Sequence, residues 1–157
     1  MKKNLKINFS KTGNFPEIDY YFKSVVRRAV KATLEHEKFP YDALVSVTFC
    51  DADYIRNLNK TYRNKDSATD VLSFPIYEDG NFDIQECISG ALLGDVVISI
   101  PRAHEQAKEL GNTFLEEVAF LTVHSVLHLL GYDHERSAEE DELQCKLQRE
   151  ICGSIEV

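Results

Sequence analysis

The sequence predicts an α/β protein of the α+β type, in which a four-stranded mixed sheet is packed by about five helices. Three observations lead to this class. Short runs rich in β-branched and aromatic residues occur near residues 5–9, 44–50, 70–74 and 93–99. Longer segments with helical periodicity separate these runs. A chain of 157 residues can bury a sizeable core, so one layered domain over residues 1–157 is the default.

The chain begins with a predicted strand and a predicted helix. Residues 5–9 alternate apolar and polar side chains, which is the period of a half-buried strand. The segment from Pro16 to Asp19 has the character of a helix start, because proline suits the first turn and acidic side chains favour its positive end. Apolar residues then recur at helical spacing to about His36.

A second strand and helix should follow. Residues 43–49 are rich in β-branched and aromatic side chains, and Asp51 is placed to cap a helix from about Ala52 to Tyr62. Arg63 would then stand just past the end of this helix. The buried stripe of the helix is predicted to consist of Ile55, Leu58 and Tyr62.

The middle of the chain is its least regular part. A strand over residues 70–74 is followed by a turn signal at residues 78–81, which favours the tip of a loose hairpin. Strand character returns from about Leu92 to Ile100, and Pro101 opens a helix that Gly111 ends.

The segment from about Phe114 to Leu130 is the predicted centre of the fold. It begins in a capping box at Thr113 and is apolar nearly all round, so we expect a helix that is buried on most sides. A buried helix holds its few polar side chains firmly, as a preorganised site requires. A last helix should begin near Ser137. Its buried face is predicted to consist of Leu143, Leu147 and Ile151.

Composition restricts the partners and the compartment. The chain has 18 basic and 26 acidic residues and a net charge of −8. This argues against a general nucleic-acid binder, because non-specific affinity comes mainly from cations on phosphate, but it allows a local basic patch. The 4 cysteines are widely spaced, so we expect reduced thiols in a cytoplasmic protein. Met1-Lys2-Lys3 precedes no long apolar run, so we expect neither a signal peptide nor a membrane span.

Three of the 5 histidines lie close together at the end of the central helix. His124 and His128 are four positions apart, so a helix presents both imidazoles on one face. Gly131 can adopt the left-handed conformation that ends a helix, and the resulting turn would bring His134 to the same ion. Three imidazoles are a common protein set for a catalytic zinc ion. The pattern predicts one ion per chain, zinc or another divalent transition metal, bound by His124, His128 and His134.

Other functions of the histidine motif are open. Its spacing is partly that of the metzincin metalloproteases, but those enzymes have a glutamate as general base where this chain has Ser125. A serine hydroxyl takes up no proton near neutral pH, so a metalloprotease-like hydrolase is disfavoured. A non-catalytic module with structural zinc is a third alternative, and it would need a fourth protein ligand.

Three further polar residues are weaker candidates for this site. His104 is a conceivable additional ligand, although an exposed or packed histidine is the favoured interpretation. Glu117 lies two turns before His124 on the same helical face, where it could hydrogen-bond an imidazole or act as a base through water. Asp133 is expected to hold the turn rather than to orient a histidine.

The string HSVLHLLGYDHE resembles the motif HGxLHLxGYDH of the YbeY endoribonuclease family, a family of ribosomal RNA maturation factors. Two more blocks are similar to the family, Leu58–Pro75 and Leu93–Ser99, the latter resembling its LGDIxIS strand. The resemblance spans about residues 45–150. Ser125 departs from the usual glycine of the family, and its hydroxymethyl group could narrow the space beside the metal.

The resemblance implies a single-strand-specific, zinc-dependent endoribonuclease that matures the 3′ end of small-subunit ribosomal RNA and acts in ribosome quality control. It also implies ribosomal-protein and GTPase partners, with no DNA or membrane. It places the functional arginine at Arg63, whose planar guanidinium matches phosphate oxygens. From the residues alone, a charged surface loop at Arg63 is equally compatible. The nucleophile stays open between water at the metal and an RNA 2′-hydroxyl.

Overall fold

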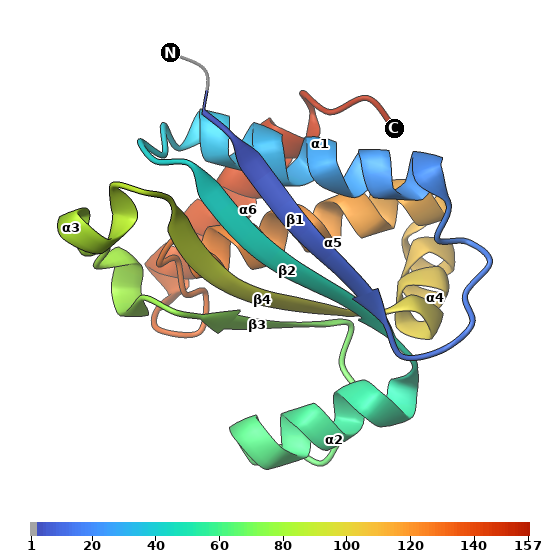
Figure 1. Cartoon of the computed structure of the whole chain (residues 1–157). Helices are drawn as coiled ribbons and strands as arrows, with labels where there is room; N and C mark the ends of the chain where they lie inside the picture. Colours follow the sequence, from blue (N-terminus) through green and yellow to red (C-terminus); the bar gives the residue numbers. More distant parts are fainter. Residues whose placement is uncertain (1–2) are drawn as a thin grey trace.

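The computed structural model describes residues 3–157, in which four strands form one sheet in the order β1-β2-β4-β3 (Figure 1). Strands β1 (Leu5–Lys11), β2 (Ala43–Cys50) and β4 (Ala91–Ser99) are parallel neighbours. Strand β3 (Val71–Pro75) pairs antiparallel with β4 and forms one edge of the sheet. The predicted four-stranded mixed sheet is therefore confirmed.

Most helices cover one face of this sheet. Helices α1 (Tyr20–His36), α5 (Phe114–Leu129) and α6 (Ala138–Cys152) lie behind it, and α4 (Ile100–Leu110) lies at one end (Figure 1). Helix α5 contacts α1, α4, α6, β3 and β4, which confirms its predicted central position. Helix α2 (Ala52–Arg63) lies on the opposite face. Within residues 3–157, no helix combines the length and apolar character that crossing a membrane requires.

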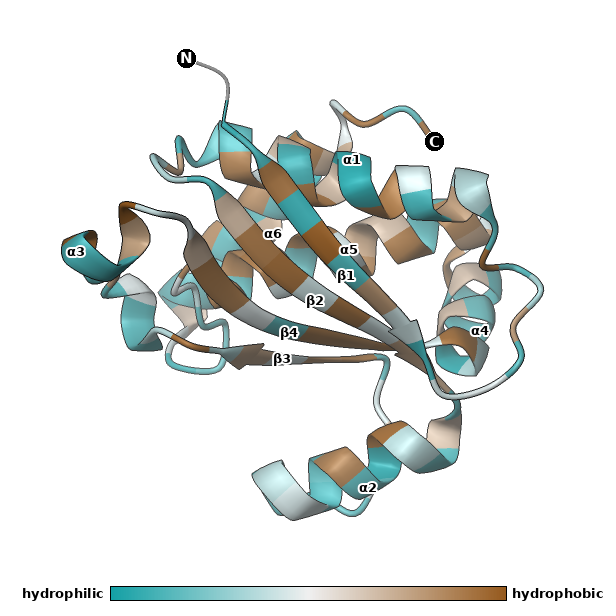
Figure 2. Ribbon diagram, in the orientation of Figure 1, coloured by the Kyte–Doolittle hydropathy of each residue, from teal (hydrophilic) through white to brown (hydrophobic). Residues whose placement is uncertain are grey.

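Alternation along the strands separates the two faces of the sheet. In Figure 2, brown apolar residues run along the central strands β2 and β4. On β4, Val96 and Ile98 belong to the main core beneath α1 and α5, whereas Val97 points to the other face. There it packs with Ile55 of α2 and Leu72 of β3 in a smaller cluster. The site described below lies at the end of α5, beside the edge strand β3.

Two helix boundaries differ from the sequence prediction. Helix α1 begins at Tyr20 rather than near Pro16, because the Asp19 carboxylate accepts a hydrogen bond from the Phe22 amide at 2.8 Å and caps the helix. Helix α2 begins after Asp51 as predicted and includes Arg63 as its last residue.

The buried stripe of α2 is shorter than predicted. Ile55 is fully buried, but Tyr62 is 67% exposed and meets only the edge of the Phe74 ring, with ring centroids 5.5 Å apart. The prediction for Tyr62 was wrong because helical periodicity does not reveal where the covered part of the sheet ends.

Strands β3 and β4 pair antiparallel, so they form the expected loose hairpin, with residues 76–90 as its long connection. This connection contains a 3-10 turn, η1 (Glu78–Gly80), and a four-residue helix, α3 (Ile84–Cys87), capped by Asp83. Gly80 has φ +73°, and a Cβ atom there would lie 2.6 Å from the Leu130 carbonyl oxygen. This turn is therefore packed directly against the end of α5.

The predicted buried face of α6 is confirmed in part. Ile151 is buried and Leu147 packs half-buried against a cluster to which α5 contributes, but Leu143 is 46% exposed. Gln144 and Gln148 are also buried, so two amides share the face that meets α5, and the apolar spacing did not predict them.

Candidate active site

One pocket collects the three histidines of the motif together with Arg63. It has a volume of about 330 Å³ and lies among the end of α5, strand β3 and the loop that joins α2 to β3. The protein thus brings together all four residues that the sequence singled out. Further lining residues are Asn59, Lys65, Ser67, Ala68, Thr69, Asp70, Val71, Leu72, Ser73 and Glu135.

Helix α5 holds two of the histidines through local structure that the sequence encodes. The capping box at its start is present, with the Thr113 hydroxyl accepting from the Glu116 amide at 3.1 Å and the Glu116 carboxylate accepting from the Thr113 amide at 2.9 Å. At the other end, buried Leu127 and Leu129 anchor the turn that carries His128. Both imidazoles are therefore held by a helix whose ends and packing are well defined.

Gly131 turns the chain back toward the site. It has φ +112°, and a Cβ atom at this position would lie 2.6 Å from the Gly80 nitrogen. Only glycine meets both conditions without strain. The Tyr132 amide then donates to the Leu127 carbonyl at 3.1 Å, and the chain leads directly to His134.

One potential metal-binding group among residues 3–157 contains a carboxylate. One ligand atom from each of His128, Asp133 and His134 lies within 4.8 Å of the others. His124 stands outside this group, although its ring centroid is 4.9 Å from that of His134. Asp133 also holds the turn, as expected, because its carboxylate accepts from the Glu135 amide at 3.0 Å.

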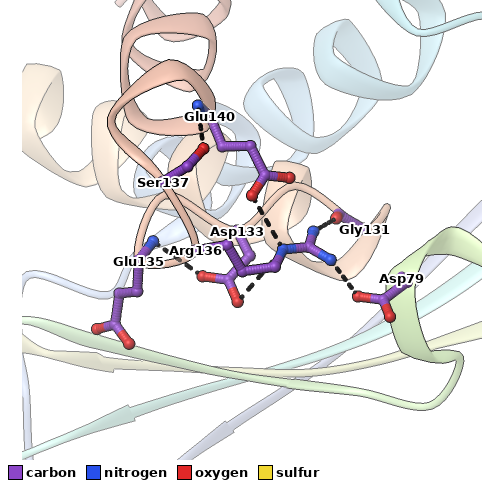
Figure 3. Close-up of polar contacts among 7 residues, drawn as sticks. All are labelled: Asp79, Gly131, Asp133, Glu135, Arg136, Ser137 and Glu140. Carbon is purple, nitrogen blue, oxygen red and sulfur yellow. Dashed lines mark hydrogen bonds and ion pairs between the residues drawn. The ribbon is translucent and has the colours of Figure 1, made fainter.

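Arg136 stabilises the turn that contains Asp133 and leads to His134 (Figure 3). Its guanidinium donates to the Gly131 carbonyl at 2.6 Å and to the Asp79 carboxylate at 2.5 Å. Its Nε lies 3.2 Å from a carboxylate oxygen of Glu140 in the first turn of α6. These contacts connect η1, the turn and α6, and the sequence contained no pattern that pointed to them.

The pocket favours neutral imidazoles. Burial lowers the pKa of His124 and of His128, and the nearby Arg63 guanidinium lowers the pKa of His128 further, against the opposing charge of Asp133. His134 Nδ1 is buried and has no hydrogen-bond partner within residues 3–157. A neutral imidazole offers a lone pair to a metal ion, so the donor set fits zinc or a similar transition metal.

Arg63 is joined to the histidine helix through two buried serines. Its Nη2 donates to the Ser73 carbonyl on β3 at 2.9 Å, and the Ser73 and Ser125 hydroxyl oxygens are 2.5 Å apart. Ser125 is fully buried and is not among the pocket-lining residues. The prediction that the Ser125 hydroxyl narrows the pocket was therefore wrong. This hydroxyl is hydrogen-bonded to Ser73 on β3 instead.

Glu117 and His104 do not join the site. Glu117 is buried and accepts from the Gln106 amide of α4 at 3.1 Å, because two helical turns place it about 10 Å along the axis from His124. The suggestion that Glu117 contacts an imidazole was wrong. His104 lies 2.7 Å from Glu17 and stacks on Phe114, as the favoured interpretation predicted.

Comparisons with known proteins agree with the motifs. The family described as "Endoribonuclease YbeY" matches residues 8–156. The chain is 50% identical over 133 residues to an endoribonuclease YbeY from Caldanaerobacter subterraneus subsp. tengcongensis, which covers 82% of this chain and 81% of the relative. It is 44% identical over 147 residues to the Clostridium botulinum (strain Loch Maree / Type A3) protein of that name, covering 85% and 87%.

A solved structure is also similar. The solution structure of TM1509 from Thermotoga maritima superposes with a TM-score of 0.55 at 29% sequence identity. The alignment covers 94% of this chain and 89% of that one.

Proposed function

The chain belongs to the YbeY endoribonuclease family, and from this premise we propose that it cleaves single-stranded RNA in the pocket beside the end of α5. The observation that carries the proposal is that His124, His128, His134 and Arg63 line one pocket, although they come from two helices and a loop. The whole chain, residues 1–157, would act as one endoribonuclease domain.

The proposed ligands of the metal are His124, His128 and His134, with one zinc ion per chain or another divalent transition metal. The lowered pKa of His124 and of His128 supports this, as does the buried and unpartnered Nδ1 of His134. Asp133 is close enough to His128 and His134 to serve as a further donor. When bound, zinc supplies positive charge that polarises a phosphate oxygen and acidifies water.

The proposed role of Arg63 is to bind the phosphate and to stabilise the charge that grows on it. Guanidinium presents several donors in a planar fork, and the recorded bond to the Ser73 carbonyl uses Nη2. Strand β3 thus orients the Arg63 guanidinium through the Ser73 carbonyl, and the other N–H groups of the guanidinium stay available to a phosphate in the pocket. A preorganised donor of this kind acts most strongly on charge that develops in the transition state.

The proposed setting is ribosomal RNA processing in the cytoplasm, with the 3′ end of small-subunit ribosomal RNA as the target and quality control as a related role. Arg63 and Lys65 line the pocket, but Lys65 lies 3.8 Å from the Glu135 carboxylate, and the net charge of the chain is −8. Such a balance gives weak non-specific affinity for RNA. Binding to a ribosomal protein or a GTPase would bring the enzyme to its RNA substrate and so compensate for this weak affinity.

Peptide hydrolysis is the weaker alternative. The Ser125 hydroxyl is engaged with Ser73, and Glu117 faces α4, so neither stands where a metalloprotease needs its base. A structural zinc site has one observation in its favour, because Asp133 could complete a four-ligand set. Absorption of a cobalt-substituted sample distinguishes four fixed protein ligands from an open position.

The direct test compares substrates on one preparation. The protein is stripped of metal with a chelator, reloaded with zinc, and incubated with an unstructured RNA, the same RNA as a duplex, DNA of the same sequence, and denatured casein. We expect cleavage of the unstructured RNA alone, and only after zinc is restored. Casein hydrolysis, or equal RNA cleavage in the stripped sample, would contradict the proposal.

A further inference from the structure

We propose that Gln148 is a positioning residue that selects the tautomer of His124 and so directs the Nε2 lone pair toward the metal. This inference rests on the proposed function, because it assigns a role within the same site. It concerns a residue on α6 that lies outside the pocket lining and outside the histidine motif.

The argument begins with two glutamines in the core. Gln144 is 0% exposed and Gln148 is 3% exposed, and they stand one turn apart on the face of α6 that meets α5. The Gln148 Oε1 atom lies 3.1 Å from His124 Nδ1. The Gln144 Nε2 atom lies 3.3 Å from the His124 carbonyl oxygen and 3.4 Å from His124 Nδ1.

These distances decide which atom carries the ring hydrogen. An amide oxygen only accepts, so the contact at 3.1 Å requires a hydrogen on His124 Nδ1. The competing donor, Gln144 Nε2, is farther from Nδ1 at 3.4 Å and has the His124 carbonyl as an acceptor at 3.3 Å. The shorter contact, between Gln148 Oε1 and His124 Nδ1, therefore places the ring hydrogen on Nδ1.

The orientation of the Gln148 amide decides the tautomer. In the structure Gln148 presents Oε1 to His124 Nδ1 at 3.1 Å, which is complementary to a hydrogen on Nδ1. If Gln148 presented its NH₂ group instead, Nδ1 would accept, the ring hydrogen would lie on Nε2, and no lone pair would remain there for a metal. If Gln144 presented its oxygen, that oxygen would face the His124 carbonyl oxygen, so Gln144 is the donor to that carbonyl.

The consequence for the metal site is orientation without added charge. A neutral imidazole with hydrogen on Nδ1 has its lone pair on Nε2, the nitrogen that is then free to bind a metal. Metal-binding histidines commonly donate their other ring N–H to an oxygen, frequently that of a carboxylate. An amide oxygen accepts the same hydrogen bond, less strongly than a carboxylate, but adds no negative charge to the site, which suits an anionic phosphate.

A purely structural role does not explain these amides. The Gln144 Oε1 atom is buried without a hydrogen-bond partner within residues 3–157, so this helix face leaves a polar atom unsatisfied where an apolar side chain would pack freely. The face that carries the glutamines is the one that reaches His124.

The first measurement uses the metal-free protein. Long-range ¹H–¹⁵N NMR spectra of the histidine rings identify the tautomer of His124. We expect hydrogen on Nδ1 in the unchanged protein, loss of this preference in Gln148→Leu, and its retention in Gln144→Leu. Gln144→Leu is the matched control, because it removes an equally buried amide one turn away without removing the acceptor. Hydrogen on Nε2 in the unchanged protein would overturn the inference, even if no variant folded.

The second measurement is zinc affinity, by competition with a chromophoric chelator. We expect zinc to bind Gln148→Leu roughly ten- to hundredfold more weakly, and Gln148→Glu, which keeps an acceptor oxygen, to recover most of this loss. Equal affinity of Gln148→Leu and the unchanged protein would refute a positioning role. If instead the unchanged protein shows the expected tautomer but binds no zinc, the proposed function fails while the tautomer assignment stands.

Discussion

Four of the 5 histidines of this chain divide into two groups with opposite surroundings. His36 and His104 lie on the surface beside carboxylates, at 2.9 Å from Glu37 and 2.7 Å from Glu17. His124 and His128 lie in the pocket, where burial lowers the pKa of both imidazoles. The Glu37 carboxylate, by contrast, raises the pKa of His36.

The difference shows how one side chain serves two purposes. A carboxylate beside an exposed imidazole favours the protonated form, which can neither accept a hydrogen bond nor bind a metal. Burial in the pocket favours the unprotonated form, which can accept a hydrogen bond or bind a metal, and for His124 this effect of burial outweighs the Gln148 hydrogen bond, which raises its pKa. The surroundings, rather than the presence of histidine, support the proposed metal site in this pocket.

The largest expected effect comes from removing a pocket histidine. His128→Ala deletes one ligand atom of the proposed metal site, so we expect loss of zinc and of RNA cleavage to background. Zinc content by elemental analysis and cleavage of unstructured RNA measure the two losses. The surface variant His104→Ala should retain both. Metal-dependent cleavage by His128→Ala would contradict the division into two groups.

Arg63→Ala should separate binding of the metal from turnover. We expect normal zinc content and a fall in kcat on the order of 10²–10³-fold, because one preorganised donor for the phosphate is lost. Arg56→Ala on the same helix is the matched control, since Arg56 pairs with the exposed Asp66 at 2.8 Å. A parallel loss of zinc in Arg63→Ala would show that the arginine supports the fold of the site.

Titration of the metal-free protein sharpens the comparison. In NMR spectra His36 should titrate above its usual pKa of 6.5, and His124 and His128 below it. Where the folded-state pKa is depressed, the unfolded chain binds more protons, so His124 and His128 reduce stability as pH falls below about 6.5. The contribution of His36 has the opposite sign and is lost as pH rises through its folded-state pKa. A pKa above 6.5 for His124 or His128 would refute this view.

The smallest expected effect is at the serine pair. Ser125→Ala removes a buried hydroxyl 2.5 Å from that of Ser73, so we expect a loss of about 1 kcal/mol and a decrease in Tm of roughly 2–4 °C. Zinc content should not change, because Ser125 does not line the pocket. The exposed Ser89→Ala variant is the control for thermal denaturation. An equal Tm for the two variants would show that the pair contributes no stability.

Local patterns in the sequence predicted much of this protein. The strands, the cap at Asp51, the capping box at Thr113 and the turn at Gly131 depend on neighbours within a few residues, so the chain encodes them directly. The pairing of His124 with His128 is of the same kind, because helical geometry alone places them on one face.

Contacts between distant segments were decided only by the tertiary structure. Gln148 meets His124 across 24 residues, and Ser73 meets Ser125 across 52. Hydrophobic periodicity indicates that one face of a helix is covered, but it does not identify the side chain that covers it. The arrangement of α6 against α5 therefore turned two glutamines toward His124, and the spacing of apolar residues on α6 did not predict them.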